Sequence, residues 1–251
     1  MKLALIGASG VVGSRVLPEA LQRGHAVTAI CRHPEKLAPH PRMTPRSANA
    51  RIVEEIANVV VGHEAVICCY NVYHDRRVGN EYAEILEGVR SIIQGVKRAR
   101  VKRMLVVGGA GSLFVSPGVQ LVDHPQFPAY FFKIAPREHL EWLSSIIGVP
   151  VDTFLRPDHE FTSAPPGLIA AWRLALDLFE HDQTYDWTFL SPPWFLRPGP
   201  RTGRYRMGGE NLLMDGDTPA GISCDDLAIA IVDEMENAKH TRQHWTVASA
   251  Q

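Results

Sequence analysis

Three glycines near the start of the chain form its most informative chemical motif. Gly7, Gly10 and Gly13 are spaced as G-x-x-G-x-x-G, after a short apolar run and before an amphipathic stretch. In such a strand, turn and helix, the first glycine permits a tight turn, the second lets the backbone approach a pyrophosphate, and the third lets helix and strand pack closely. The free N–H groups at the helix start then suit phosphate. The motif predicts a dinucleotide site, and a tight turn without a ligand is the alternative.

The end of the second predicted strand bears on the choice between NAD and NADP. A site that prefers NAD places an acidic side chain there for the ribose 2′-hydroxyl. The sequence instead reads Arg32-His33, with Lys36 soon after. A guanidinium suits a 2′-phosphate by its charge and its forked donors. Because the acid is absent and the base is present, the sequence favours NADP, used as NADPH, with NAD as the alternative cofactor. An ordinary solvated arginine at a strand end is the other interpretation.

Two further stretches carry side chains that could assist a reaction. Ser112 follows the glycine-rich bend at 108–111, near the expected nicotinamide position, and could hydrogen-bond a substrate carbonyl or the nicotinamide amide. The alternative is a serine that satisfies the backbone of a turn. Tyr130 and Lys133 are spaced i,i+3, and a tyrosine that donates a proton needs a nearby cation to lower its pKa. A loop that buries the surrounding aromatic side chains is the reading we favour for that stretch.

The elements that must position these residues alternate along the first half of the chain. Helices are predicted at 11–23, 51–60 and 81–100, and strands at 2–7, 26–32, 65–71 and 103–108, with one more in 42–50 that Pro45 interrupts. The strands are continuous apolar runs, typical of a parallel sheet buried on both faces. Right-handed crossovers then predict an α/β fold with a doubly wound parallel sheet, a Rossmann fold, whose ligands bind beyond the carboxyl ends of the strands.

The second half of the chain is less regular. Two stretches, 136–157 and 168–192, each predict a helix followed by a strand. A Pro- and Gly-rich loop at 191–203 precedes a hairpin around 205–214, a helix at 227–237 with cap chemistry at 223–226, and a closing strand at 244–248. We expect one domain over 1–251, in which 191–251 form a small C-terminal, substrate-binding portion.

Composition limits the class of partner. The 251 residues include 26 basic and 27 acidic side chains, which gives no sign of a nucleic-acid partner. None of the four cysteines has the C-x-x-C spacing of a zinc or redox site, so reduced thiols are expected. The uncharged run 104–122 approaches the length of a membrane span, but its glycines and Pro117 predict a strand and a loop. We expect a cytoplasmic protein, a monomer or homodimer, that binds a small-molecule substrate and neither nucleic acid nor membrane.

Several motifs in order resemble the atypical short-chain dehydrogenase/reductases, in particular the NADH-flavin reductase branch related to biliverdin reductase B. They are G-A-S-G-V-V-G-S, C-R-H-P-E-K-L, V-K-R-M-L-V-V-G-G-A-G-S-L, D-W-T-F-L-S-P-P and R-T-G-R-Y-R-M-G-G. The resemblance covers most of 1–127 and 168–248. It places Ser112 beside the nicotinamide. It also implies a set of cofactor-binding positions: Gly7, Ser9, Gly10, Val11 and Val12 at the pyrophosphate, Arg32 at the 2′-phosphate, Asn49 near the adenine, and Cys69, Tyr70 and Asn71 at the ribose. To these we add Gly13, His33 and Gly109 as expected cofactor-binding residues.

Residues 129–165 depart from that branch and look like an insertion the length of an αβ unit, where a substrate lid would lie. Its side chains have no family counterpart: Tyr130, Lys133, His139, Trp142, Asp158 and His159. Elsewhere Ala48-Asn49 replaces the family's G-D, and the Y-x-x-x-K pair is missing.

The resemblance implies an NADP-dependent oxidoreductase that passes hydride from NADPH to a flavin-like, quinone or conjugated carbonyl compound. Ser112 would orient the substrate, and Tyr130 or an ordered water would supply the proton. The alternatives are an NADP-binding sensor without catalysis, and an isomerase, lyase or cyclase that retains the cofactor, because the superfamily includes all of these.

Overall fold

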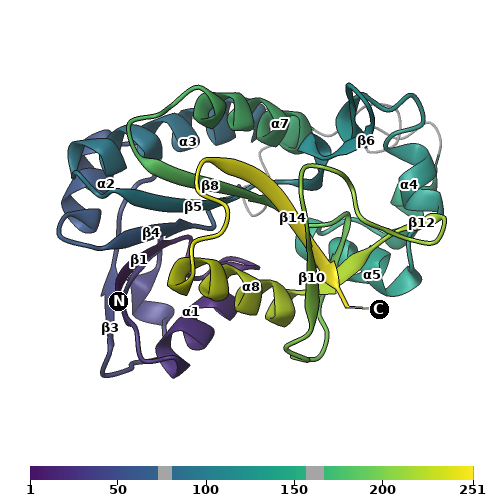
Figure 1. Cartoon of the computed structure of the whole chain (residues 1–251). Helices are drawn as coiled ribbons and strands as arrows, with labels where there is room; N and C mark the ends of the chain where they lie inside the picture. Colours follow the sequence, from purple (N-terminus) through teal and green to yellow (C-terminus); the bar gives the residue numbers. More distant parts are fainter. Residues whose placement is uncertain (73–80, 157–166, 251) are drawn as a thin grey trace.

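A sheet of eight strands runs through the molecule in the computed structural model, which describes residues 1–72, 81–156 and 167–250 (Figure 1). Its order is β10-β14-β8-β5-β4-β1-β2-β3. The strands are β1 (Lys2–Ile6), β2 (Ala26–Ile30), β3 (Met43–Arg46), β4 (Ala65–Cys68), β5 (Arg103–Val107), β8 (Asp186–Ser191), β10 (Tyr205–Gly208) and β14 (Gln243–Ser249). All neighbours are parallel except β10, which pairs antiparallel with β14. The predicted doubly wound α/β sheet is confirmed, and the strand order reverses between β1 and β4.

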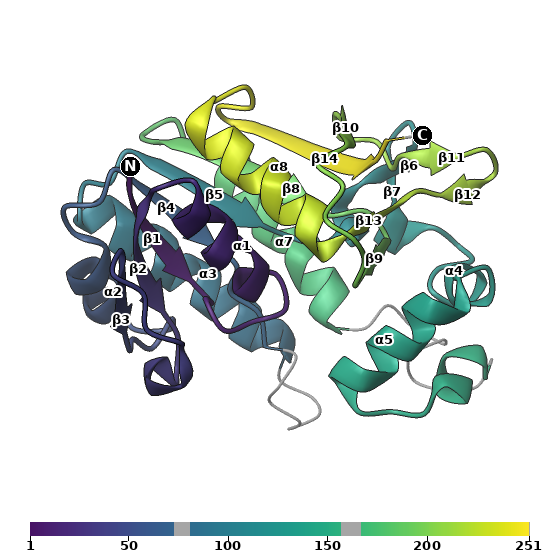
Figure 2. The same ribbon diagram turned by 90° about the horizontal axis from the view of Figure 1, so that it is seen from below.

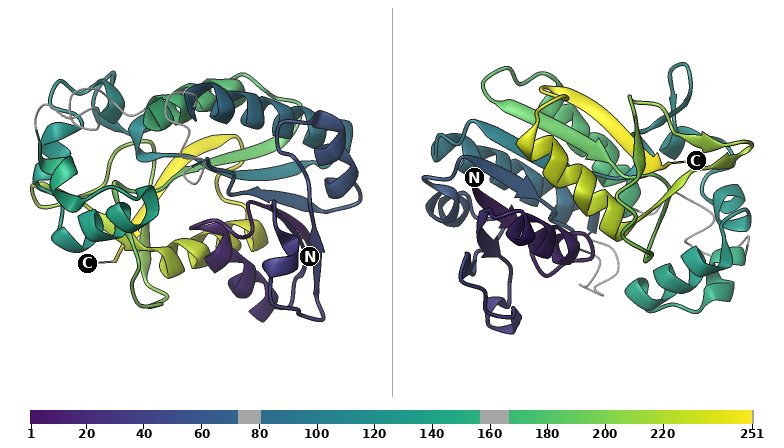
Figure 3. Two further views of the ribbon diagram at one scale, coloured as in Figure 1. Left: turned by 180° about the vertical axis from the view of Figure 1, so that it is seen from behind. Right: turned by 60° about the horizontal axis from the view of Figure 1, so that its bottom comes forward.

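Helices cover both faces of this sheet. Helices α1 (Gly13–Gln22) and α8 (Cys224–Glu236) lie side by side on one face, as Figure 2 shows. On the other face lie α2 (Val53–Val60), α3 (Glu81–Arg98) and α7 (Gly167–Glu180). Two short helices, α4 (Ala129–Lys133) and α5 (Arg137–Ile147), stand apart from both layers at the end of the molecule where the C-terminus also lies (Figure 3).

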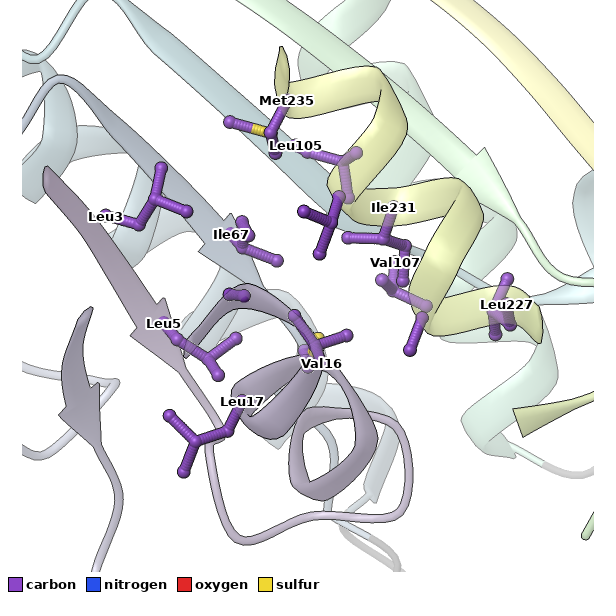
Figure 4. Close-up of a cluster of buried hydrophobic side chains, with 14 of the residues drawn as sticks. Leu3, Leu5, Val16, Leu17, Ile67, Leu105, Val107, Leu227, Ile231 and Met235 are labelled. Atoms are coloured by element: carbon purple, nitrogen blue, oxygen red, sulfur yellow. The ribbon is translucent and has the colours of Figure 1, made fainter. Parts of the chain in front are cut away.

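Past their first residue, the central strands β1, β4 and β5 are apolar because both of their faces are buried. On one side, Leu3, Leu5 and Ile67 pack toward Val16 of α1 and Ile231 of α8 (Figure 4). The alternate residues of the same strands, Ala4, Ile6 and Val66 among them, belong to the second cluster under α2, α3 and α7. Successive side chains of a strand point to opposite faces of the sheet. Because both faces are buried, every position along such a strand is apolar.

Most elements predicted from the sequence are confirmed. Strand β3 forms despite Pro45, because it is the edge strand, where a missing N–H is tolerated. Helix α8 begins at Cys224, earlier than the predicted 227, and has the predicted cap: the Ser223 hydroxyl oxygen accepts a hydrogen bond of 3.0 Å from the N–H of Asp226. The closing strand is β14.

Two predicted elements are wrong. Residues Val151–Leu155 form a 3-10 helix, η4, instead of a strand, because Phe154 and Thr153 are buried in the cluster around α4 and α5, away from the central sheet. Residues Tyr205–Gly208 do not begin a local hairpin, because β14 offers them a sheet edge. The hairpin lies later, between β11 (Met214–Asp215) and β12 (Thr218–Pro219).

Much of the stretch 191–250 belongs to the central fold. Strands β10 and β14 belong to the central sheet, and α8 covers one of its faces. The remaining short strands are β6 (Phe114–Ser116) paired with β7 (Val119–Gln120), and β9 (Phe195–Arg197) paired with β13 (Gly221–Ser223). Three 3-10 segments complete the described elements: η1 (Pro34–Lys36), η2 (Ala110–Ser112) and η3 (Leu121–Asp123).

Among the described residues, no helix is both long and apolar enough to cross a membrane. The same residues contain no group of three or more His, Cys, Asp or Glu side chains placed to hold a metal ion.

Candidate functional site

A cavity of about 1150 Å³ opens at the carboxyl ends of the parallel strands. Its walls include the turn after β1 and the segments that follow β2, β3, β4 and β5. The strand order reverses between β1 and β4, and ligands of doubly wound sheets bind beyond such a reversal. The rest of the wall comes from single residues of α2, α4 and η4, from α3, α5 and α7, from residues 148–149 and from the stretch 192–196.

The glycine turn after β1 is fixed by close backbone contacts. Gly7 has a φ of +82°, and a Cβ placed on it would lie 2.4 Å from the carbonyl oxygen of Cys69. A Cβ on Gly13 would lie 2.1 Å from the carbonyl oxygen of Gly7. The N–H groups of Gly7 and Ala8 both donate to the carbonyl of Ile30, at 2.9 and 3.2 Å. Only glycine fits at positions 7 and 13 without moving the backbone.

This turn leaves N–H groups free at the start of α1. Val12, at the N-cap, has no side-chain capping bond. Within the described ranges, the N–H groups of Ser9, Val11 and Val12 have no hydrogen-bond acceptor. Three free donors at a helix start suit the oxygens of a pyrophosphate. The residues present therefore fit a dinucleotide.

Most of the predicted cofactor positions line the cavity. All of them do so except Gly13, which is buried under the turn, and His33. The His33 side chain is 64% exposed, and its Nδ1 lies 3.1 Å from Glu35 Oε1 outside the cavity. Arg32 lines the cavity at the end of β2 and has no ion-pair partner within 1–72, 81–156 and 167–250. Its charge is therefore available to a ligand.

The segments after β3 and β4 are held by their own hydrogen bonds. The side-chain oxygen of Asn49 accepts from the N–H of Arg51 at 3.0 Å, and the N–H of Asn49 donates to Glu55 at 2.7 Å. The hydroxyl of Tyr70 donates to the carbonyl of Glu84 at 3.1 Å, and burial raises the pKa of Tyr70 to about 12. Tyr70 thus lines the cavity as a neutral phenol.

Ser112 does not face the cavity. It is fully buried, and its hydroxyl donates to the carbonyl of Gly109 at 2.9 Å. The Oγ of Ser191 lies 2.8 Å from the Oγ of Ser112 and 2.9 Å from Nε2 of His244. Burial lowers the pKa of His244 to about 4, so its ring is neutral. The Gly109 carbonyl can only accept, and this fixes the direction of the other two hydrogen bonds. Nε2 of His244 donates to Ser191, and the Ser191 hydroxyl donates to Ser112.

The Ser112 hydroxyl, predicted to contact nicotinamide or substrate, thus bonds within the protein and does not line the cavity. The alternative from the sequence, a serine that satisfies a turn, describes what is seen. Residues 108–111 of this turn line the cavity after β5. The hydroxyl chain ties that turn to β8 and to β14, so Ser112 acts on the cavity only through the backbone of Gly109.

Tyr130 and Lys133 also lie away from the cavity. Both are on α4, which replaces the predicted loop, and Tyr130 is 42% exposed. The inward face of this short helix is taken by Phe131 and Phe132, which are buried. The proton donor and the cation predicted from the sequence therefore lie on the solvent-facing side of α4. Asp158 and His159 lie outside the described residues.

Six aromatic side chains form a wall that no sequence motif assigns to a ligand, and two of them, His139 and Trp142, lie in the stretch without a family counterpart. We call it the aromatic subsite; it consists of Phe132, His139, Trp142, Phe154, Trp172 and Trp194. One signal was present in the sequence. His139, Trp142, Leu143 and Ile146 are spaced i, i+3, i+4 and i+7, so they share one face of α5, and all four line the cavity. The other members come from distant segments.

Comparison with known proteins connects this geometry to a family. Residues 7–238 match the family model described as NAD(P)H-binding. The chain belongs to the NAD(P)H-binding family. It is 32% identical to the uncharacterized protein YwnB of Bacillus subtilis (strain 168) over 254 residues, with 99% of each chain covered.

Two solved structures extend the similarity. A "putative epimerase" from Bacteroides thetaiotaomicron is 34% identical, with a TM-score of 0.77 and coverage of 100% of this chain and 97% of the other. A "putative NADH-flavin reductase" from Streptococcus pneumoniae TIGR4 is 26% identical, with a TM-score of 0.75 and full coverage of both chains. The predicted resemblance to atypical short-chain dehydrogenase/reductases is confirmed, and so is the Rossmann fold.

In this NAD(P)H-binding protein, Ser112→Ala separates a structural role from direct contact with a ligand. We expect a loss of about 1–3 kcal/mol in the free energy of unfolding, because the Gly109 carbonyl and the Ser191 hydroxyl lose a buried partner. NADPH affinity should fall by less than roughly tenfold, since the cavity-facing groups remain. Urea unfolding and NADPH titration measure the two effects.

Ser145→Ala is the control for this substitution, because the exposed Ser145 hydroxyl bonds only locally, to the carbonyl of Trp142. Its stability should stay within about 0.5 kcal/mol of the parent protein. If Ser112→Ala unfolded like the parent protein yet lost all turnover of NADPH, Ser112 would have to touch the reacting groups.

Proposed function

We propose that this protein is an NADPH-dependent reductase that transfers hydride to a flavin-like, quinone or other conjugated carbonyl compound. One observation carries the proposal: the glycine turn with its free N–H groups and the aromatic subsite line the same cavity of about 1150 Å³. A dinucleotide and a planar ring can then occupy one enclosed space, and holding two reactants together removes much of the entropic barrier between them.

The residues that would hold NADPH follow from the geometry of the cofactor side. The N–H groups of Ser9, Val11 and Val12 bind the pyrophosphate, and the guanidinium of Arg32 binds the 2′-phosphate. When bound, NADPH supplies the hydride. The backbone at Gly109, held from behind by Ser112, forms the wall after β5, where the nicotinamide of this fold is expected.

In this proposal an ordered water protonates the reduced substrate. Of the two proton sources predicted from the sequence, Tyr130 lies on the surface of α4, so an ordered water remains. Tyr70 lines the cavity, but its pKa of about 12 and its bond to Glu84 make it a poor acid. Residues 129–155 act in this proposal as the wall that encloses the substrate and limits the approach of further water.

NADPH oxidation tests the proposed function. The near-ultraviolet absorbance of NADPH is followed with the purified protein and a flavin, a quinone or an enone as acceptor. Sustained loss of NADPH that depends on both protein and acceptor is the expected result. Tight NADPH binding without turnover on any acceptor would contradict a reductase, and would favour an NADP-binding sensor or a non-redox enzyme.

A further inference from the structure

The two walls of the cavity differ in charge. The cofactor side includes Arg32, Arg51, Glu55 and Glu84. On the other side, the described lining residues from 132 to 154 and from 167 to 196 contain no Asp, Glu, Lys or Arg. An ionised ligand group would find no oppositely charged side chain among these lining residues, so this wall favours an uncharged group.

Five rings of the aromatic subsite pack against one another in a chain, and the sixth, Trp172, packs on Phe189. The Phe132 ring centroid lies 5.1 Å from that of Phe154 and 5.5 Å from that of Trp194. The His139 ring lies 6.3 Å from that of Trp194 and 6.0 Å from that of Trp142. These separations are those of packed aromatic pairs, and a flat ring system is the ligand shape that such a wall contacts best.

His139 adds no charge to this surface. Its Nδ1 donates to the carbonyl of Leu196 at 2.9 Å, which leaves Nε2 as the bare acceptor of a neutral ring. Burial, with a smaller contribution from the charge of Arg197, lowers the pKa of His139 to about 4, so the ring stays neutral in the physiological range.

Two of the three tryptophans of the subsite contribute N–H donors that lack acceptors. Trp194 is 9% exposed and Trp172 is 2% exposed. The indole Nε1 of each is buried and has no hydrogen-bond partner among the residues that the structure describes. Buried N–H groups in proteins are nearly always paired, so an acceptor supplied by a ligand would complete these two.

We propose that the aromatic subsite binds a neutral, planar substrate, whose ring carbonyl accepts a hydrogen bond from the indole N–H of Trp194, and that it rejects rings bearing a negative charge. The inference rests on the proposed function, because it names the substrate class of the same cavity. It narrows that class from conjugated carbonyl compounds in general to uncharged ones.

Binding of three small probes tests this inference without turnover. Calorimetric titrations with NADP⁺ present and absent compare 1,4-naphthoquinone, its 2-sulfonate and naphthalene, which lacks the carbonyls. We expect the sulfonate to bind on the order of 100-fold more weakly than the parent quinone. Equal affinity of the two quinones would overturn the proposed exclusion of charge.

Trp194→Phe tests the hydrogen bond, because it keeps an aromatic ring and removes the N–H. Its affinity for 1,4-naphthoquinone should fall about tenfold, with naphthalene and NADPH unaffected. The control is Trp187→Phe, since the Trp187 indole donates to the carbonyl of Asp182 and does not line the cavity. That control should leave all three affinities unchanged. Equal losses for naphthoquinone and naphthalene in Trp194→Phe would overturn the assignment of Trp194 as a donor.

The outcomes separate this inference from the proposed function. If NADPH is never oxidised but the probes bind with the predicted selectivity, the inference stands and the reductase proposal fails. If NADPH is oxidised equally well by both quinones, the reductase proposal stands and the inference fails.

Discussion

Gly7→Ala is expected to cost about 2–5 kcal/mol of unfolding free energy and to abolish tight NADPH binding. Two physical effects add. A φ of +82° strains any residue with a Cβ, by about 1–2 kcal/mol, and the new methyl group would lie 2.4 Å from the Cys69 carbonyl oxygen, a further overlap worth about 1–3 kcal/mol. Relieving that overlap must move the turn whose N–H groups face the phosphates. Urea unfolding and NADPH titration measure the two losses.

Gly118→Ala is the matched control. Gly118 has a similar φ of +75°, but a Cβ there meets nothing within 4 Å. It should therefore show the backbone strain alone, about 1 kcal/mol, with NADPH affinity unchanged. If the two substitutions destabilised the protein equally, the close approach of β1 and β4 at the turn would not be what requires glycine at position 7.

Arg32→Glu is expected to reduce NADPH affinity by about 100-fold while NADH affinity changes less than about threefold. The substitution removes a charge-assisted hydrogen bond to the 2′-phosphate and puts a carboxylate in its place, and NADH has no phosphate there to repel. Because Arg32 is exposed at the cavity edge, the difference between the cofactors should shrink as ionic strength rises. Titrations of both cofactors at two salt concentrations measure it.

Arg90→Glu controls for net charge, because Arg90 is exposed on α3 and does not line the cavity. It makes the same change in charge and should leave both affinities close to those of the parent protein. Equal weakening of NADPH and NADH by Arg32→Glu would exclude a 2′-phosphate contact and remove the argument for NADP.

Local patterns in the sequence were sufficient for the cofactor side of the molecule. Continuous apolar runs predicted β1, β2, β4 and β5, because a strand buried on both faces has no polar position. The glycine triplet predicted the turn after β1, because backbone conformation and close approach depend on single residues. Each turn between a strand and the next helix is encoded locally, and the parallel sheet brings these turns to one edge. The cofactor side of the cavity could therefore be predicted from the sequence.

Contacts between distant segments of the chain could not be predicted from local sequence patterns. The glycine bend before Ser112 gave no indication that Ser191 and His244 would bury its hydroxyl from two other strands. The spacing of Tyr130 and Lys133 predicted a pair, but the packing of Phe131 and Phe132 decided that the pair faces solvent.

By itself, then, the sequence determined the parallel sheet, the dinucleotide turn and the position of Arg32, because these depend on local periodicity and on backbone geometry at single residues. Only the tertiary structure decided that His139, Phe154, Trp172 and Trp194 share one uncharged wall. Aromatic residues are apolar in any local pattern, and whether they fill a core or line a cavity depends on what other segments leave open beside them.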